Sequence, residues 1–388
     1  MRRIASIDSF RGLTMFLMIW VNDFGSLNNI PKWLKHALNN EDYLGFSDLI
    51  FPWFLFATGL SIPFSIKNRL NKNQSNFQIF RHITFRSIAL IIMGLFHMNM
   101  ELFNHEESII QKPVFVILAT VSFFMIWIDY SRYELKGSLY KKIFPIVGMM
   151  MLLVLLFIYV GKDYNNLPIK FGFHWWGILG LIGWVYFLVA SGYLMFGDSI
   201  YYLVIAFILS FGINAMSLNG LSIGLLSSIP GIGLQAFTYG GVLISLIIMK
   251  EKNRNNIASL KVILFLGIVS FLFGLIFHKY FIINKISGTP TWVLLSLSSA
   301  FIFYAFIFWI VDISGHVEWY STINVAGTAT LTCYLVPYFY YSFLQIFEIQ
   351  FPVLLNTGYL GLLKSLLFSL LIIFFTKVMV KNRIQIKI

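Results

Sequence analysis

Three polar residues near the start of the chain have side chains that suit acyl-transfer chemistry: Asn22, His36 and Asp48. Histidine is the usual general base near neutral pH. A carboxylate can fix the tautomer of an imidazole ring, and an amide can donate a hydrogen bond to the oxyanion that forms at a carbonyl group. The spacing leaves simpler roles open, because a loop histidine is often only solvated and Asp48 suits the N-cap of a helix.

Two arginines suit the binding of phosphate groups, which guanidinium groups bind through paired hydrogen bonds. Arg11 precedes Asn22 by eleven positions on one predicted helix, which separates the two by about 16 Å along the helix axis. Arg86 opens another predicted helix in the same way. The alternative is that both arginines only anchor helix ends at a membrane surface.

Further histidines fall at the predicted outer ends of apolar segments. His97 and Asn99 lie near the end of one segment, and His174 precedes a pair of tryptophans. We expect them to contact a substrate, although such residues are also common at membrane interfaces. The chain has a single cysteine, Cys333, so no internal disulfide can form. No metal site is predicted, because no histidine, cysteine or carboxylate motif has metal-ligand spacing.

The composition indicates a membrane protein. Of the 388 residues, 58% are hydrophobic and 11% are charged, whereas soluble domains carry about 25% charged residues. This excludes a water-soluble globular protein. The net charge of +12 does not indicate nucleic-acid binding, because basic residues in such a chain usually mark the cytoplasmic side of the membrane.

The apolar segments predict an all-α bundle of about twelve transmembrane helices, with ten or eleven as alternatives. With the N-terminus in the cytoplasm, most of the 28 lysines and arginines fall on the inner side. The positive-inside rule therefore favours an even count and two cytoplasmic ends. The tight turn at Gly197 and Asp198 is the least certain boundary. The predicted segments are 9–24, 46–66, 84–100, 113–129, 143–160, 174–197, 199–217, 230–249, 259–278, 291–313, 324–345 and 358–380.

An ordered series of motifs resembles a known family. The runs are DSFRG from Asp8, WVN ending at Asn22, LKHA around His36 and SDLIFPWF from Ser47. They resemble the transmembrane domain of the heparan-α-glucosaminide N-acetyltransferase family and its bacterial relatives. The resemblance covers most of the chain and is most specific in the first hundred residues.

The resemblance implies that an acetyl group passes from cytoplasmic acetyl-CoA to an amino sugar or glycan on the far side of the membrane. It assigns His36 as the catalytic histidine, Asn22 as the neighbouring amide and Asp48 as the supporting carboxylate. Arg11 and Arg86 would then hold the nucleotide end of CoA, and the pantetheine arm would thread between helices. We expect a multi-pass enzyme of the bacterial inner membrane that contacts lipid and needs no metal. A homodimer is compatible with the sequence.

The domain organisation and two departures complete the expectation. We expect one domain over 1–388 with core motifs in 5–100 and 174–380, and with 113–160 as a two-helix insertion. The chain has Gly180-Leu181 where many relatives in this family carry Gln-Arg. It also has Ala329 and Pro337 where the lysosomal member of the family has Asn and His. These substitutions leave open a family member that has lost catalysis. A second alternative is a transporter of amino sugars or cell-wall sugars, in which the buried polar residues line a pathway.

Overall fold

The computed structural model is a helical bundle, and it describes residues 4–132, 138–163, 165–221, 223–250, 256–316, 320 and 322–388. The α-helices are α1 (Ala5–Phe24), α2 (Ser47–Leu70), α3 (Asn76–Glu101), α4 (Lys112–Trp127), α5 (Ser138–Ile158), α6 (Gly177–Phe196), α7 (Ile200–Leu218), α8 (Gln235–Lys250), α9 (Asn256–Phe277), α10 (Pro290–Phe308), α11 (Asn324–Thr328), α12 (Thr330–Ile346) and α13 (Gly358–Lys381). Short helical turns are η1 (Lys32–Leu34), η2 (Tyr130–Arg132), η3 (Gly224–Leu226), η4 (Trp309–Ile313) and η5 (Val353–Asn356).

The predicted apolar segments coincide with these helices, although α3 begins at Asn76 instead of 84 and α8 at Gln235 instead of 230. Arg86 was predicted to open its helix, but it lies inside α3. Two further segments are interrupted. The segment predicted over 324–345 is divided into α11 and α12 at Ala329, whose φ of −118° and ψ of 42° lie outside the helical range. The end of α10 continues as a π-helical turn, η4. Between α5 and α6 the described chain also forms a short antiparallel hairpin, with β1 (Gly161–Lys162) paired to β2 (Pro168–Ile169).

The outer helices expose apolar side chains that only lipid would cover. Phe157 on α5, Tyr201 on α7 and Phe265 on α9 are 81%, 84% and 63% exposed, and most of the apolar length of these helices is unburied. Within the described ranges, eight helices are long and apolar enough to cross a membrane. The chain is therefore an integral membrane protein. The count of twelve spans and the cytoplasmic location of both ends stay predictions.

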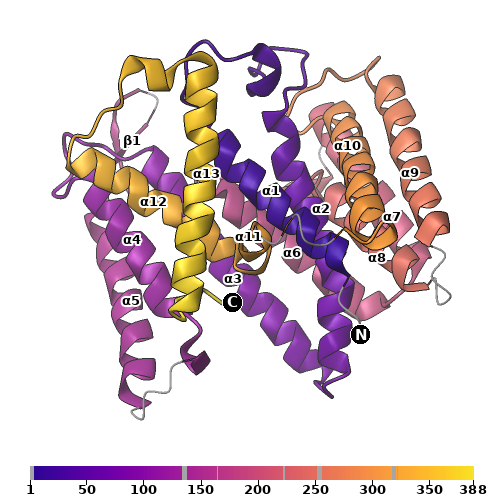
Figure 1. Ribbon diagram of the computed structural model, residues 1–388, viewed down its shortest axis with the longest axis horizontal. Coiled ribbons are helices and arrows are strands. Elements are labelled where there is room, and N and C mark those ends of the chain that lie inside the picture. Colours follow the sequence, from indigo (N-terminus) through magenta and orange to yellow (C-terminus); the bar gives the residue numbers. More distant parts are fainter. Residues whose placement is uncertain are drawn as a thin grey trace.

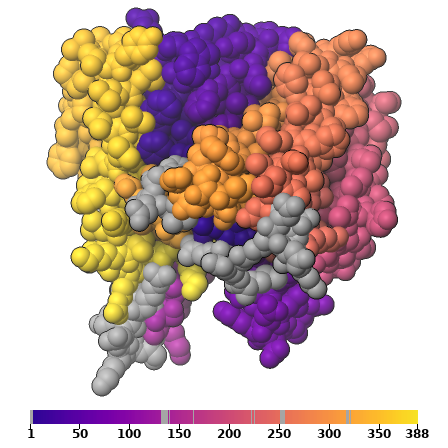
Figure 2. All heavy atoms as spheres, turned by 45° about the vertical axis from the view of Figure 1, so that its right-hand side comes forward, coloured from indigo at the N-terminus to yellow at the C-terminus, as the bar shows by residue number. Residues whose placement is uncertain are grey.

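Helix α1 lies at the centre of the bundle. It packs against α2, α10, α11, α12 and α13, and it runs across the middle of Figure 1. Helices α4 and α5 lie to one side of it and α7 to α10 to the other. In Figure 2 the N-terminal part of the chain fills the upper face between α13 in yellow and the orange helices. Helix α10 of one flank contacts α1 directly, and α4 of the other flank packs against α12, which contacts α1.

Glycines allow the closest helix contacts. A Cβ atom on Gly94 of α3 would collide with the backbone of Gly180 and of Trp176, and one on Gly177 (φ +66°) would lie 2.5 Å from the Gly94 carbonyl oxygen. Helices α3 and α6 consequently pack backbone to backbone, as small residues permit in membranes.

Replacing Gly94 with Val is expected to destabilise the protein, because the added side chain must push α3 and α6 apart. Overpacking of this kind costs about 1–3 kcal/mol or more. The check is the thermal unfolding temperature in detergent. Gly212→Val on α7 is the matched control, because nothing lies within 4 Å of a Cβ atom at Gly212. Equal unfolding temperatures for the two variants would contradict this packing.

Candidate active site

His36 and Asp48 form the predicted pair. The His36 Nδ1 atom lies 2.7 Å from the Asp48 Oδ1 atom. The Asp48 side chain is only 1% exposed, and its Oδ2 atom accepts hydrogen bonds from the backbone N–H groups of Ala37 (3.0 Å) and Gly45 (3.1 Å). Asp48 lies in the first turn of α2, but these contacts direct its carboxylate to the loop. They hold the carboxylate at the Nδ1 edge of the imidazole ring.

The loop that carries His36, residues 25–46, is held on α2 by its own contacts. The Ser47 hydroxyl donates to the Leu34 carbonyl, and the Phe46 N–H donates to the Trp33 carbonyl over 2.7 Å. A Cβ atom on Gly45 would collide with the Lys35 carbonyl, so only glycine fits there. Local packing therefore sets the position of the histidine.

The pairing defines which nitrogen of His36 can act as a base. An ionised carboxylate only accepts hydrogen bonds, so Nδ1 must carry the proton that it donates to Asp48. The lone pair then lies on Nε2, which has no hydrogen-bond partner in the described part of the chain, and the side chain is 45% exposed. A histidine held by a carboxylate with a free Nε2 atom is the arrangement of a general base.

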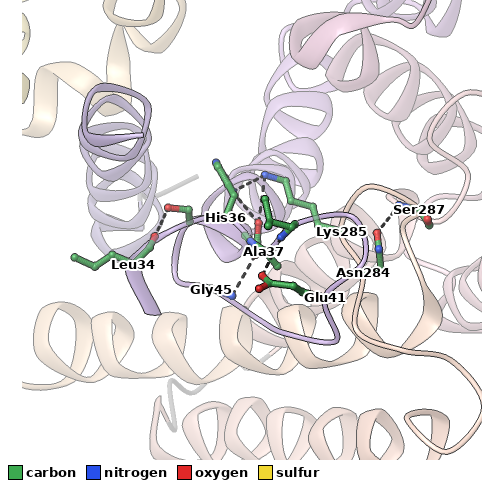
Figure 3. Close-up of polar contacts among 11 residues, drawn as sticks. Leu34, His36, Ala37, Glu41, Gly45, Asn284, Lys285 and Ser287 are labelled. Carbon is green, nitrogen blue, oxygen red and sulfur yellow. Dashed lines mark hydrogen bonds and ion pairs between the residues drawn. The ribbon is translucent and has the colours of Figure 1, made fainter. Parts of the chain in front are cut away.

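Lys285 joins this pair, although no sequence pattern had indicated it. It lies in the loop between α9 and α10, and its Nζ atom is 3.1 Å from His36 Nδ1 and 3.6 Å from Asp48 Oδ1. Figure 3 shows the lysine side chain reaching toward His36. Because an ammonium group and the protonated Nδ1 atom are both donors, the favourable partner of the lysine is the Asp48 carboxylate. Burial lowers the pKa of Lys285 below its usual range, and the nearby carboxylate opposes that shift.

The loop between α9 and α10 is clamped to the His36 loop at two other points. The Asp42 carboxylate accepts hydrogen bonds from the Ile283 N–H (2.7 Å) and from the His278 ring (2.8 Å). The Asn284 side chain donates to the Asn39 carbonyl. Although burial raises it, the pKa of Asp42 is lowered overall by its bonds to Ile283 and His278. Several hydrogen bonds thus join the two loops around the histidine.

Replacing Lys285 with Met should lower kcat of the transfer reaction proposed below by about tenfold, equivalent to about 1.4 kcal/mol in the barrier. The variant keeps most of the side-chain stem but leaves the Asp48 carboxylate without its neighbouring charge. Affinity for the donor should stay the same. Lys279→Met, an exposed residue of the same loop, is the control. Equal kcat values for the two variants would exclude a role for the lysine charge.

Arg11 and Arg86 line one cavity, here called the arginine cavity, with a volume of about 490 Å³. The Arg86 guanidinium lies 4.8 Å from the centre of the Tyr186 ring, and its buried Nε atom has no hydrogen-bond partner among the residues described. Arg11 is held by Asp8 at 3.9 Å and by Thr330 at 3.5 Å. The cavity offers positive charge at this end and an unused donor for an anion.

Apolar walls continue the arginine cavity along α1. Met15 and Met18 follow Arg11 at helical spacing on the same face of α1, and Leu90 and Leu179 lie on other walls. The cavity is also bordered by residues of both chain ends, Ile4, Gln385, Ile386, Lys387 and Ile388. Its lining thus combines two arginines, the Asp8 carboxylate and a large apolar surface.

Asn22 lines a second cavity, here called the tyrosine cavity, of about 160 Å³. Its walls are Ile19, Asn22, Tyr334, Pro337, Tyr338 and Tyr341. His36 lines neither cavity. Trp20 contacts Phe46 of the His36 loop. Asn22 follows Trp20 by two positions on α1, and residues two positions apart on a helix point in nearly opposite directions. No hydrogen bond joins the Asn22 amide to His36 among the described residues, and the role predicted for Asn22 stays a prediction.

The three residues predicted to contact substrate lie in different surroundings. His97 is buried and stacks on Tyr338, a wall of the tyrosine cavity, with ring centres 4.3 Å apart. The Asn99 amide donates to the carbonyl groups of Leu95 and Gly172 and thereby fastens the segment after β2 to α3. His174 is exposed and lines neither cavity. The roles proposed for these residues stay predictions.

The fold and these contacts define a class of protein: a polytopic membrane protein with a histidine–carboxylate pair at one end of a central helix and an arginine-lined cavity at the other. Residues 3–182 match a family described as a domain of unknown function, DUF5009.

Over 98 residues the chain is 39% identical to human heparan-alpha-glucosaminide N-acetyltransferase and 37% identical to the mouse protein of that name. Each alignment covers 25% of this chain and only 14% of the relative. The resemblance to this family that the motifs predicted is confirmed.

Proposed function

We propose that the protein is a membrane acetyltransferase that moves an acetyl group from acetyl-CoA, bound on the side of Arg11 and Arg86, to an amino sugar or glycan on the other side. The names of the two relatives describe the transfer of an acetyl group to a glucosaminide nitrogen. The observation that carries the proposal is the arginine cavity, which joins two guanidinium groups to an apolar interior.

The chemistry of the cavity suits the two ends of the donor. Arg11 and Arg86 would bind the phosphate groups of the CoA nucleotide, with the free Nε atom of Arg86 as one donor. The pantetheine arm is narrow and joins two amide groups and a hydroxyl group with methylene and methyl groups. It would follow α1 past Met15 and Met18, opposite the hydroxyl groups of Thr58 and Ser61. Binding energy gained far from the reacting carbonyl would thus orient the thioester.

At the outer end, His36 would act as the general base. Its Nε2 atom takes a proton from the acceptor amine or hydroxyl while that group attacks the thioester carbonyl carbon. The carbon–sulfur bond then breaks, and the CoA thiolate takes up a proton. In the alternative route, Nε2 itself attacks the carbonyl carbon and expels the CoA thiolate as the carbon–sulfur bond breaks. The acceptor then attacks the acetyl-imidazole carbonyl, the carbon–nitrogen bond to His36 breaks, and the released imidazole takes up the proton that the acceptor loses. Since His36 lines neither cavity, either route requires movement of the thioester or of loop 25–46.

The proposed orientation puts both chain ends and the arginine cavity in the cytoplasm of a bacterium and His36 at the outer face of its inner membrane. Ile4 and Ile388 line the same cavity, which supports an even number of membrane crossings. The transporter hypothesis keeps the same orientation but uses the cavities as a solute pathway.

One experiment separates these functions. Purified protein is incubated with acetyl-CoA labelled in the acetyl group and a panel of amino sugars and glycans, and products are identified by mass spectrometry. An acetylated acceptor that requires the protein is the expected result. Uptake of the sugars into proteoliposomes without acetyl-CoA, together with no acetylated product, would replace the proposal with transport. Label retained on protein without acceptor would select the acetyl-histidine route.

A further inference from the structure

The two cavities share one wall residue, Tyr334. On α1, successive turns pass from Met15 and Met18 in the arginine cavity to Ile19 and Asn22 in the tyrosine cavity. The two cavities therefore follow each other along the same helix.

Helix α12 shows the same order of residues. Thr330 and Leu331 line the arginine cavity, whereas Tyr338 and Tyr341 line the tyrosine cavity. Tyr334 lies between them at helical spacing and belongs to both. The division at Ala329 begins α12 beside the arginine cavity, so Tyr334 lies one turn into the helix at the junction of the two spaces.

The Tyr334 ring is held in an aromatic cluster. Its centre is 6.0 Å from that of Tyr338 and 5.9 Å from that of His97, and His97 and Tyr338 are stacked on each other. Aromatic pairs at these distances contribute about 0.5–1.5 kcal/mol beyond burial. The ring thus has a defined position, yet it borders open space on two sides.

We infer that Tyr334 is the partition between the donor cavity and the outer cavity, and that its ring must turn aside before a thioester can pass outward. That the passing group is a thioester rests on the proposed function. The partition itself rests only on the two cavities that Tyr334 lines. Tyr334 is accordingly a positioning residue that keeps the thioester away from outside water until the passage opens. Water excluded from a reaction site cannot hydrolyse an activated group.

Cysteine accessibility tests the partition without any substrate. The chain has one cysteine, Cys333, which is buried, so Cys333→Ser gives a background without thiols. Met15→Cys then reports on the arginine cavity and Asn22→Cys on the tyrosine cavity. In sealed vesicles of known orientation, each is treated with a membrane-impermeant methanethiosulfonate from either side.

With Tyr334 present, we expect each reporter to react from one side only, and the two from opposite sides. In the Tyr334→Ala background Met15→Cys should also react from the side that reaches Asn22→Cys, at least about tenfold faster than with tyrosine. Tyr334→Phe keeps the ring and is the matched control. Reaction of Met15→Cys from both sides with tyrosine in place, or no gain in a folded Tyr334→Ala variant, would overturn the inference.

Failure of this inference is distinguishable from failure of the proposed function. The labelling result stands whether or not acetyl-CoA is a substrate. If the enzyme is active, Tyr334→Ala should also raise acceptor-independent hydrolysis of acetyl-CoA relative to transfer, and Tyr334→Phe should not. An active enzyme with an unchanged ratio in Tyr334→Ala would remove the proposed control of thioester exposure. If Tyr334→Ala does not fold, the one-sided labelling with tyrosine in place still decides whether a barrier exists.

Discussion

His36→Ala is expected to lower kcat for acetyl transfer by about 10²–10⁴-fold, the range typical of losing a general base. Within the described part of the chain the His36 Nε2 atom has no hydrogen-bond partner, and the side chain is 45% exposed. Affinity for acetyl-CoA should be retained, because His36 does not line the arginine cavity. The measurements are initial rates with a responsive acceptor and donor affinity from equilibrium binding.

Two further variants separate chemistry from folding. Asp48→Asn should reduce kcat less than His36→Ala, because the amide still occupies the site but no longer fixes the tautomer. Loss of Asp48 contacts to Ala37 and Gly45 would also show as a lower unfolding temperature, whereas His36→Ala should leave that temperature close to wild type. Full turnover in a folded His36→Ala protein would remove the histidine from the mechanism.

Replacing either of the two arginines that line the arginine cavity is expected to produce the largest loss of affinity for acetyl-CoA. Hydrogen bonds to charged groups contribute about 1.5–3 kcal/mol, and each 1.4 kcal/mol is about tenfold in affinity. Arg11→Ala and Arg86→Ala should therefore each raise the Kd for acetyl-CoA by about 10–100-fold. The dependence of Kd on salt should weaken in both variants, because fewer phosphate contacts remain to be screened.

Arg69→Ala is the matched control for this prediction. Arg69 bonds to His82 (2.7 Å) and Gln74 (3.1 Å) and lines neither cavity. Its removal should leave the Kd for acetyl-CoA unchanged. If Arg11→Ala and Arg86→Ala behave like Arg69→Ala, the two arginines only anchor helices, and the donor site lies elsewhere.

The helices could be predicted from the sequence because long apolar runs are bounded by polar residues. The positions at which these helices are interrupted could not be predicted from the sequence. The division of α11 from α12 at Ala329 lies within an apolar run, where hydropathy gives no signal. It accompanies the close approach of Gly327 to the backbone of Asp8 and Gly12, which is a tertiary contact.

The candidate site was predictable where its members lie near each other in the sequence or carry distinctive chemistry. His36 and Asp48 meet as expected, and Arg11 and Arg86 line one cavity, although Arg86 lies inside α3 and not at the start of a helix as the sequence predicted. Lys285 was missed because it is 249 positions from His36 and lies in an ordinary polar loop.

Two residues show the limits of reading side-chain direction from spacing. Asn22 is near His36 in sequence, but the phase of α1 turns its amide toward the tyrosine cavity. Tyr334 has no distinguishing signal, because an aromatic residue in an apolar helix usually packs in the core. Its significance comes only from the two spaces that it borders.

The contacts between the His36 loop and the α9–α10 loop affect the order in which the site can assemble during synthesis. The family match over residues 3–182 contains His36 and Asp48 but not Lys285. A ribosome must therefore translate nearly three quarters of the chain before the last charged neighbour of the pair exists. Fragments that end before α9, expressed alone, would display the histidine without that neighbour, and co-expressing the complementary fragment would be needed to supply it.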